Sequence, residues 1–302
     1  MATGLPFKSS EREAIWGHVH LNLLQHAGVV PDSRFHYDFS SFVPDFRGSS
    51  SAIDRIVQLP CYISANTILV TPDNSLEQLR CRALKDGKKL LVATYKLSRG
   101  FVLLDPKRIS EDQFEMASLL DTMERPGIGR PLTLAQMNEK VDLCVTGVLA
   151  VTEQGVIIRE SPNYFEIQWG ILLDRKALDK KTPVIAVAHS CQVIGWAEEL
   201  LKHSQSDGQL RIIPDFIVTP ERVTTSSGVD ELSANIDFDA LDPELFAKIP
   251  LLQELRGIQM MEKIMKGAGF PQEPPKVIPT MPDADEQLGI SIVDKLMRGY
   301  KV

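Results

Sequence analysis

The segment spanning residues 66–95 constrains the fold more than any other part of the chain. It reads NTILVTPD, then LEQLRCRALKDG, then KKLLVATY. The outer stretches have the length and apolar content of buried strands, and the middle stretch is typical of a helix that Gly87 closes. A strand, a helix of about a dozen residues and a second strand make a right-handed crossover between parallel strands. The sequence therefore predicts a β-α-β unit.

The same pattern returns further along the chain. The predicted strands are the apolar runs VDLCVTGVLAV, TPVIAVAH and PDFIVTP, and the predicted helices between them are DRKALDKK and GWAEELLKH. This order predicts an α/β fold with an open, mostly parallel sheet and helices on both faces. Two further helices are predicted before the first unit, one from Ser9 to a terminating Gly28 and one through residues 52–57.

The end of the chain differs in pattern from the rest. Residues 251–269 carry an apolar stripe at helical spacing, and five prolines follow between Pro271 and Pro282. Proline at this density excludes a helix or a central strand, so the segment is predicted to run extended. We expect 1–255 to form the α/β domain and 256–302 to hold a helix, a proline-rich tether and a terminal helix. This C-terminal arm packs on its own domain or joins the subunits of a homo-oligomer.

Charge and hydropathy exclude two classes of partner. The chain has 33 Lys and Arg against 40 Asp and Glu, a net charge of −7, which argues against a protein that neutralises a nucleic-acid backbone. No window approaches the ~18 to 20 uninterrupted apolar residues of a membrane span. The four cysteines lack Cys-x-x-Cys spacing, and the first residues turn charged before an apolar stretch forms. We therefore expect a cytoplasmic protein whose partner is a small molecule.

The residues that follow the predicted strands are the first candidates for a site. In open α/β sheets, ligands bind beyond the carboxyl ends of the strands. The segments at that edge are 71–74, 95–100, 151–164, 189–192 and 219–222. We expect them to form one cavity that accepts an anionic ligand.

Several segments, taken in order, resemble a known family. They read VPDFRGSSSA, VTPDNSLEQLRCRALKDGKKLL, LSRGFVLLDP, VDLCVTGVLAVTEQG, YFEIQWGIL, TPVIAVAHSCQVI and DFIVTPERV. Together they resemble the 5-formyltetrahydrofolate cyclo-ligase family, also called methenyltetrahydrofolate synthetase, and in particular its longer cyclo-ligase-like branch. The resemblance covers about residues 11–255 and leaves the C-terminal arm out.

The resemblance implies a fold similar to the group of glucosamine-6-phosphate isomerase, ribose-5-phosphate isomerase and CoA-transferase. It also implies a reaction in which Mg-ATP activates the formyl oxygen of 5-formyltetrahydrofolate and the neighbouring folate nitrogen then attacks. The products are 5,10-methenyltetrahydrofolate, ADP and phosphate. Such chemistry needs backbone N–H groups and cations around the transferred phosphoryl group, and a metal ion that bridges phosphate oxygens. ATP, Mg²⁺ and a reduced folate are therefore the implied cofactors and substrate.

The sequence departs from the family at a glycine-rich loop, which in the family is roughly Gly-x-Gly-x-Gly-Tyr-x-Asp. Residues 159–166 read RESPNYFE, which keeps the tyrosine as Tyr164, lengthens the acid to Glu166 and contains no glycine. Pro162 removes a backbone donor and fixes φ, which disfavours a phosphate-binding loop of the family's shape. The His-Asp pair that is common in the branch reads His-Ser at residues 189–190. ATP dependence is thus predicted to be altered.

The resemblance and the strand-end rule together select the candidate site residues. Proton transfer is assigned to His189 and Glu166, because an imidazole titrates near neutrality and a carboxylate can act as a base. Arg159 and Arg222 are assigned to anionic groups, and Tyr164 to the face of a ring. The remaining substrate-binding candidates are Arg47, Asp73, Arg99, Glu160, Asn163 and Trp169.

Each assignment has a structural alternative. The imidazole of His189 is alternatively hydrogen-bonded within its loop, and the arginines alternatively form surface salt bridges. Glu160 and Glu166 are alternatively solvated or hold Mg²⁺, although no metal-ligand set is assigned. Trp169 is alternatively part of the core. Cys191 is the one cysteine placed for nucleophilic work, with a plain buried thiol as the alternative.

The sequence leaves three functions open. The first is a cyclo-ligase-like enzyme that acts on a reduced folate or a related heterocyclic carboxylate. The second keeps the cleft without ATP, as a hydrolase, lyase or transferase on another small molecule, and the altered loop favours it. The third is a non-catalytic binding or scaffold subunit whose C-terminal arm docks on a partner.

Overall fold

The computed structural model of the chain describes residues 9–30, 42–159, 164–195, 212–226, 236, 238 and 241–267. The chain divides into two compact units, Met1–Ile258 and Gln259–Val302. The sheet and the candidate site both belong to the first unit. No helix in the ranges given above is long and apolar enough to cross a membrane.

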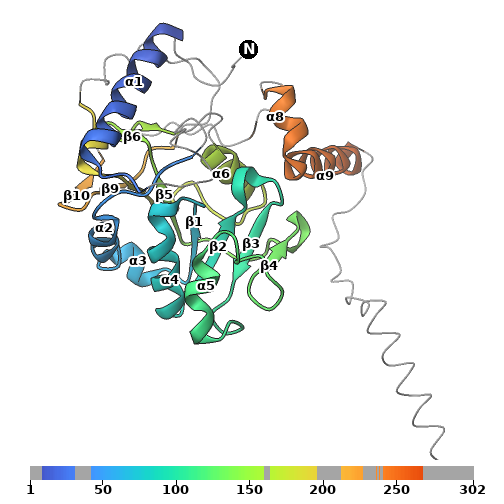
Figure 1. Ribbon diagram of the computed structural model, residues 1–302. Coiled ribbons are helices and arrows are strands. Elements are labelled where there is room, and N and C mark those ends of the chain that lie inside the picture. The colour runs from blue at the N-terminus through green and yellow to red at the C-terminus, as the bar shows by residue number, and fades with distance from the viewer. Residues whose placement is uncertain are drawn as a thin grey trace, which may run out of the picture. The chain divides into compact units, whose positions relative to one another are not determined.

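The first unit is built on an eight-stranded sheet with the order β10-β9-β8-β5-β1-β2-β3-β4 (Figure 1). The five strands from β9 to β2 in this order run parallel, while β3, β4 and β10 are antiparallel to their neighbours. The strand bounds are β1 (Thr67–Val70), β2 (Lys89–Ala93), β3 (Phe101–Leu104), β4 (Arg130–Leu132), β5 (Leu143–Gly147), β8 (Val184–Val187), β9 (Phe216–Val218) and β10 (Val223–Thr225). A separate hairpin pairs β6 (Ala150–Val151) with β7 (Ile157–Ile158).

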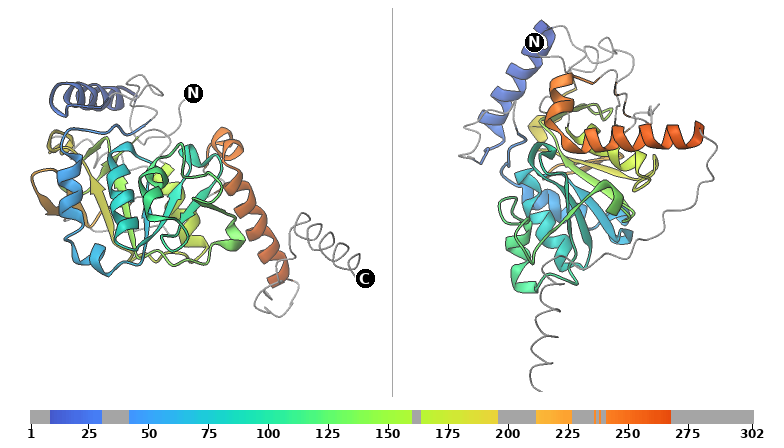
Figure 2. Two further views of the ribbon diagram at one scale, coloured as in Figure 1. Left: turned by 60° about the horizontal axis from the view of Figure 1, so that its bottom comes forward. Right: turned by 90° about the vertical axis from the view of Figure 1, so that its right-hand side faces the viewer.

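Helices cover both faces of the sheet, as the sequence predicts. They are α1 (Ser9–His26), α2 (Ser49–Ile56), α3 (Pro60–Ser64), α4 (Glu77–Lys85), α5 (Phe114–Ser118), α6 (Tyr164–Asp174), α8 (Pro243–Lys248) and α9 (Pro250–Gly267). Short 3-10 helices are η1 (Asn74–Leu76), η2 (Tyr95–Leu97), η3 (Glu111–Gln113), η4 (Leu134–Gln136) and η5 (Ser190–Gln192). Figure 2 shows the strands between two helical layers.

Alternation along the strands divides the core into these two layers. In β1, Ile68 and Val70 pack with residues of α1, α2, α4 and α5, whereas Leu69 packs with residues of α6 and the start of α9. All four side chains of this strand are buried, which is why residues 68–70 form a continuous apolar run rather than an alternating one. The open, mostly parallel α/β fold is therefore confirmed.

The β-α-β unit predicted at residues 66–95 is present as β1, α4 and β2. The strands pair in parallel register, with Thr67 opposite Lys89 and Val70 opposite Val92. After α4 the chain turns at Gly87, whose φ of +76° lies in the left-handed region that glycine tolerates without strain. This unit places the carboxyl ends of two neighbouring strands at one edge of the sheet.

The predicted helix DRKALDKK is wrong, because the crossover helix ends where this segment begins. The apolar run FEIQWGILL forms α6, and Lys176 ends it with a φ of +57°. The N–H of Ala177 donates to the carbonyl of Leu172, a helix-terminating pattern that a residue in the left-handed region permits. The turn then buries Ala177 and Leu178. The predicted helix GWAEELLKH lies outside the described residues, apart from its first residue.

The predicted helix near the C-terminus is present as α9. In the first unit, Leu251, Leu252 and Leu255 are buried against the sheet layer that contains α6. A Cβ at Gly100 would come within 3.1 Å of the Leu251 side chain, so glycine lets α9 approach the loop after β2. Residues 268–302, with the proline-rich tether and the predicted terminal helix, lie outside the described residues.

Candidate functional site

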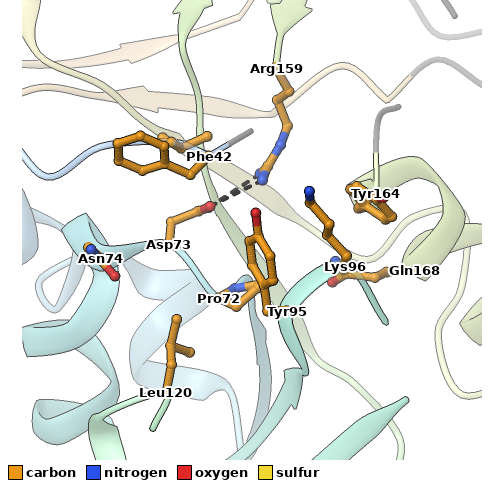
Figure 3. Close-up of a pocket in the computed structure, with 11 residues that line it drawn as sticks. Phe42, Pro72, Asp73, Asn74, Tyr95, Lys96, Leu120, Arg159, Tyr164 and Gln168 are labelled. Carbon is orange, nitrogen blue, oxygen red and sulfur yellow. Dashed lines mark hydrogen bonds and ion pairs between the residues drawn. The ribbon is translucent and has the colours of Figure 1, made fainter. Parts of the chain in front are cut away.

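A pocket lies at the edge of the sheet where β1 and β2 end (Figure 3). We call it the edge pocket, and its lining residues are Phe42, Val43, Pro72, Asp73, Asn74, Tyr95, Lys96, Leu120, Arg159, Tyr164 and Gln168. Its cavity volume is about 30 Å³, enough for roughly two water molecules. The position agrees with the rule that ligands bind beyond the carboxyl ends of parallel strands.

A buried ion pair between Asp73 and Arg159 forms one wall of the edge pocket. Arg159 Nη2 lies 3.1 Å from Asp73 Oδ1, and Arg159 Nη1 lies 3.3 Å from Asp73 Oδ2. Nη1 also donates to the Gly147 carbonyl at 2.8 Å and to the hydroxyl of Thr146. The guanidinium therefore ties the β6-β7 hairpin to the ends of β1 and β5.

The Asp73 carboxylate has further donors that compensate for its burial. Oδ2 accepts the Gly147 N–H at 2.8 Å and the hydroxyl of Thr71. A Cβ at Gly147 would lie 2.8 Å from Asp73 Oδ2, so a side chain at Gly147 would displace the carboxylate. A buried charge is tolerated when its hydrogen bonds and its partner charge are this complete.

A second arginine fixes the backbone around Asp73. Arg80 is fully buried, and its Nη1 donates to the Asp73 carbonyl at 3.0 Å and to the Thr71 carbonyl at 3.2 Å. Its Nε donates to the Ser118 carbonyl at 2.7 Å, which joins α4 to the end of α5. Two arginines thus hold Asp73 in place. Arg159 bonds to its carboxylate, and Arg80 bonds to its backbone carbonyl.

The rim of the edge pocket comes from η2, which has an unusual backbone. Lys96 and Leu97 have φ of +54° and +55°, the left-handed region that residues with a side chain rarely adopt. Lys96 Nζ lies 5.1 Å from the centre of the Tyr95 ring. Figure 3 shows the Lys96 ammonium in the space between Tyr95, Tyr164 and Arg159. This loop therefore supplies a cation and an aromatic face.

Three of the predicted site residues meet in the edge pocket, namely Asp73, Arg159 and Tyr164. Tyr164 is the first residue of α6 and is half-buried. Glu166 lies in the first turn of the same helix and is also half-buried. Glu160 and Asn163 lie outside the described residues. The assignments of these residues to ligand or proton transfer stay predictions.

His189 caps η5, on the other side of β5 from the edge pocket, and is not among the lining residues given above. Its Nδ1 accepts the Cys191 N–H at 3.3 Å and lies 3.1 Å from Cys191 Sγ. Its ring packs edge-on against Phe46 at 5.7 Å between ring centres. Burial lowers the pKa of His189, the negative charge of Glu221 opposes that shift, and His26 adds to it. The imidazole is therefore neutral at neutral pH and engaged within its own loop.

The Cys191 thiol beside this imidazole does not have the character of a nucleophile. Burial raises the pKa of Cys191, so the protonated thiol dominates at neutral pH. Its Sγ donates to the Asn22 carbonyl of α1 at 3.6 Å. These contacts favour the alternative interpretation of Cys191, a plain thiol.

The remaining predicted residues lie away from the edge pocket. Trp169 is 1% exposed and packs edge-on against Phe165 in the core. Arg99 is exposed and pairs with Glu124, with Nε 2.6 Å from the carboxylate. Arg47, before α2, and Arg222, after β9, are exposed as well.

Sequence reasoning missed several lining residues, above all Lys96 and Gln168. Lys96 and Arg99 both lie in a segment that the strand-end rule selects, and only Arg99 was predicted from it. Gln168 lies inside the apolar run of α6, and a polar residue there is the only signal that its position differs from core. Phe42 lies in the N-terminal segment, upstream of the Arg47 that was assigned.

The groups that could contact Mg-ATP are limited among the described residues around the edge pocket. Within the ranges that the structure describes, no group of three or more His, Cys, Asp or Glu side chains is arranged to hold a metal ion. The Arg159 guanidinium, which the sequence assigned to an anion, is already hydrogen-bonded to Asp73, Thr146 and Gly147. The described residues thus offer Arg159 to an anion only if it gives up these protein partners.

Comparisons with known proteins give a consistent result. The model of the 5-formyltetrahydrofolate cyclo-ligase family matches residues 21–197. The "Methenyltetrahydrofolate synthase domain-containing protein" of Homo sapiens is 29% identical over 251 residues, which are 82% of this chain and 61% of that protein. Its Danio rerio counterpart is 27% identical over 250 residues, again 82% of this chain and 61% of that protein. The chain thus spans about three fifths of the length of these relatives.

Among solved structures, the NMR structure of Aquifex aeolicus 5,10-methenyltetrahydrofolate synthetase aligns with a TM-score of 0.42 and 15% identity. The alignment covers 74% of this chain and 96% of that protein.

Proposed function

Because the chain belongs to the 5-formyltetrahydrofolate cyclo-ligase family, we propose that it is an enzyme acting on a reduced folate or a related heterocyclic carboxylate in the edge pocket. The observation that carries this proposal is where the pocket lies. All its lining residues fall within residues 42–168, inside the part of the chain that matches the family, and it opens where β1 and β2 end.

The aromatic side chains of the pocket support binding of a flat ring. Phe42, Tyr95 and Tyr164 approach the cavity from three different segments of the chain (Figure 3). Aromatic faces of this kind pack against heterocyclic rings with little loss of side-chain entropy. Since the cavity holds only about two waters as it stands, ligand binding has to widen it.

A second candidate function differs from the parental reaction in that it does not use ATP. Residues 159–163 contain none of the loop glycines of the family pattern, and the Arg159 guanidinium is already paired with Asp73. Both observations favour an enzyme that keeps the pocket for a heterocyclic carboxylate but works without ATP, as a hydrolase, lyase or transferase.

The direct test follows the absorbance rise of 5,10-methenyltetrahydrofolate from 5-formyltetrahydrofolate, with and without Mg-ATP. Turnover only with Mg-ATP supports the parental reaction, and turnover of a folate without it supports the second candidate. The Tyr95→Leu variant should weaken either activity. Phe216→Leu should not, because Phe216 is the first residue of β9 and lies away from the carboxyl ends of the strands. A chain that neither binds nor converts any reduced folate contradicts the proposal.

A further inference from the structure

Two residues of the edge pocket, Lys96 and Gln168, occupy positions that cost the fold stability. Lys96 has φ of +54°, in the left-handed region where a side chain is disfavoured. Strain of this kind persists where the surrounding structure enforces it, and it concentrates at functional sites. Two contacts hold the backbone of this loop in place. Leu97 is fully buried, and the Thr94 hydroxyl donates to the Gly100 carbonyl at 3.0 Å.

The strained backbone directs the Lys96 side chain to the edge pocket. Its neighbour Arg99 is exposed and pairs with Glu124, whereas Lys96 lines the cavity. The interaction that the structure shows for its ammonium is with the Tyr95 ring, 5.1 Å away. An ammonium over an aromatic face keeps its three N–H donors available for an oxyanion.

Gln168 lowers the stability of the fold in a second way, through a buried acceptor without a donor. The residue is 1% exposed and lines the edge pocket from α6, yet no described residue donates a hydrogen bond to its Oε1. A buried amide oxygen without a donor loses its hydration and gains nothing in exchange. Figure 3 shows this amide on the side of the pocket where Lys96 lies.

We propose that Lys96 and Gln168 form a two-point recognition pair for the ligand of the edge pocket. Lys96 binds a carboxylate or phosphate oxygen, and Gln168 Oε1 accepts a hydrogen bond from a ring N–H of the same ligand. This inference rests on the proposed function, because a folate has ring N–H groups and carboxylates. A nucleotide has an exocyclic amine and phosphates, so it shares this chemistry and has to be distinguished by experiment.

Calorimetric titration of the full chain tests the pair with four probes: 5-formyltetrahydrofolate, 5-formyltetrahydropterin without the glutamate, ATP and inorganic phosphate. Lys96→Gln and Lys96→Gly should weaken binding of whichever anionic probe wild type binds by about tenfold or more. Gln168→Met keeps the side-chain length, and it should weaken binding of that probe by roughly three- to tenfold.

Lys176 provides the matched control, because it is also an exposed lysine with a left-handed φ, of +57°, and it lies outside the edge pocket. Lys176→Gln and Lys176→Gly should leave every affinity unchanged. Melting temperatures should change in the opposite direction to the affinities. Lys96→Gly, Lys176→Gly and Gln168→Met should melt at or above the wild-type temperature, because each removes a strained side chain or an unsatisfied acceptor.

The outcomes separate this inference from the proposed function. If 5-formyltetrahydrofolate binds and the Lys96 and Gln168 variants bind it as wild type does, the pair is wrong and the proposed function stands. If only ATP or phosphate binds, and binding depends on both residues, the pair stands and the folate substrate is wrong. Loss of affinity together with a lowered melting temperature would show a structural role and overturn the pair. If no anionic probe binds, both proposals fall.

Discussion

At the scale of single residues, the ion pair between Asp73 and Arg159 is the most consequential contact. Its side chains are 5% and 1% exposed, so the charges interact with little screening by solvent. Both side chains are also hydrogen-bonded to the backbone of Gly147 at the end of β5. The pair therefore sets the positions of the strand ends beside the pocket-lining residues.

We expect Arg159→Met to lower the free energy of unfolding by about 3 to 5 kcal/mol, because Asp73 would be left buried without its partner charge. Urea denaturation measures the loss. Arg99→Met is the control, since it breaks an arginine–carboxylate pair whose arginine side chain is 71% exposed. The control should cost less than about 1 kcal/mol. Equal losses in the two variants would contradict the structural role of the buried pair.

His189 should make stability depend on pH in a defined direction. Burial lowers the pKa of its imidazole in the folded protein below the ordinary 6.5, so the unfolded chain binds the proton more readily. The contribution is fully present above about pH 6.5 and is lost as the pH falls toward the folded pKa.

Denaturation of wild type and His189→Asn between about pH 7.5 and 5.5 measures this term, since asparagine retains an acceptor for the cap of η5. Wild type should lose more stability than the variant over that interval. A variant that loses as much as wild type would show that other groups cause the dependence.

The sequence predicted some site residues and missed others for physical reasons. Asp73 was identified because it lies three residues after the end of a buried strand, and the strand-end rule depends only on that order. Lys96 and Arg99 lie in the same short loop, whose backbone is left-handed at residues 96–97, and Lys96 is the one that lines the pocket. Spacing and composition do not predict such a backbone conformation.

At the scale of elements, the central strands were predictable because each is a short apolar run buried on both faces. The antiparallel strand β3 was not identified, although a signal existed. Residues 94–100, which connect β2 to β3, are too few for a crossover, and a connection of that length implies an antiparallel pair. The helix assigned to DRKALDKK was wrong because the apolar content that a crossover helix buries lies in the preceding run, α6.

The approach of α9 to the pocket loop is testable with a pair of glycines. Gly87 and Gly100 have φ of +76° and +80°, so alanine at either position is strained by about 1 to 2 kcal/mol. A Cβ meets nothing within 4 Å at Gly87, but at Gly100 it meets Leu251 at 3.1 Å. Gly100→Ala should therefore lose about 1 kcal/mol more than Gly87→Ala in denaturation. Identical losses would mean that α9 yields without cost.

At the scale of the whole molecule, the start of α9 should be indispensable to the first unit. Truncation after Ile249 removes Leu251, Leu252 and Leu255, which are 6%, 0% and 0% exposed. Losing even one buried leucine costs about 2 to 5 kcal/mol, so this chain should fail to fold cooperatively. A folded shorter chain would contradict this account.

The predicted role of the C-terminal arm in a homo-oligomer stays a prediction. Deletion after Gly269, followed by sizing chromatography, is the measurement that decides it. A smaller particle, by more than the deleted mass, supports an arm that joins subunits. An unchanged subunit number removes that idea and leaves self-packing.

The packing of Leu251 against Gly100 has an evolutionary consequence, because Leu251 lies beyond residues 21–197, the range that the family model matches. Relatives that carry a different side chain in place of Leu251 would support this rim differently. We expect chimaeras that exchange only the segment containing Leu251 to differ in ligand preference, even though every cavity-lining side chain is identical.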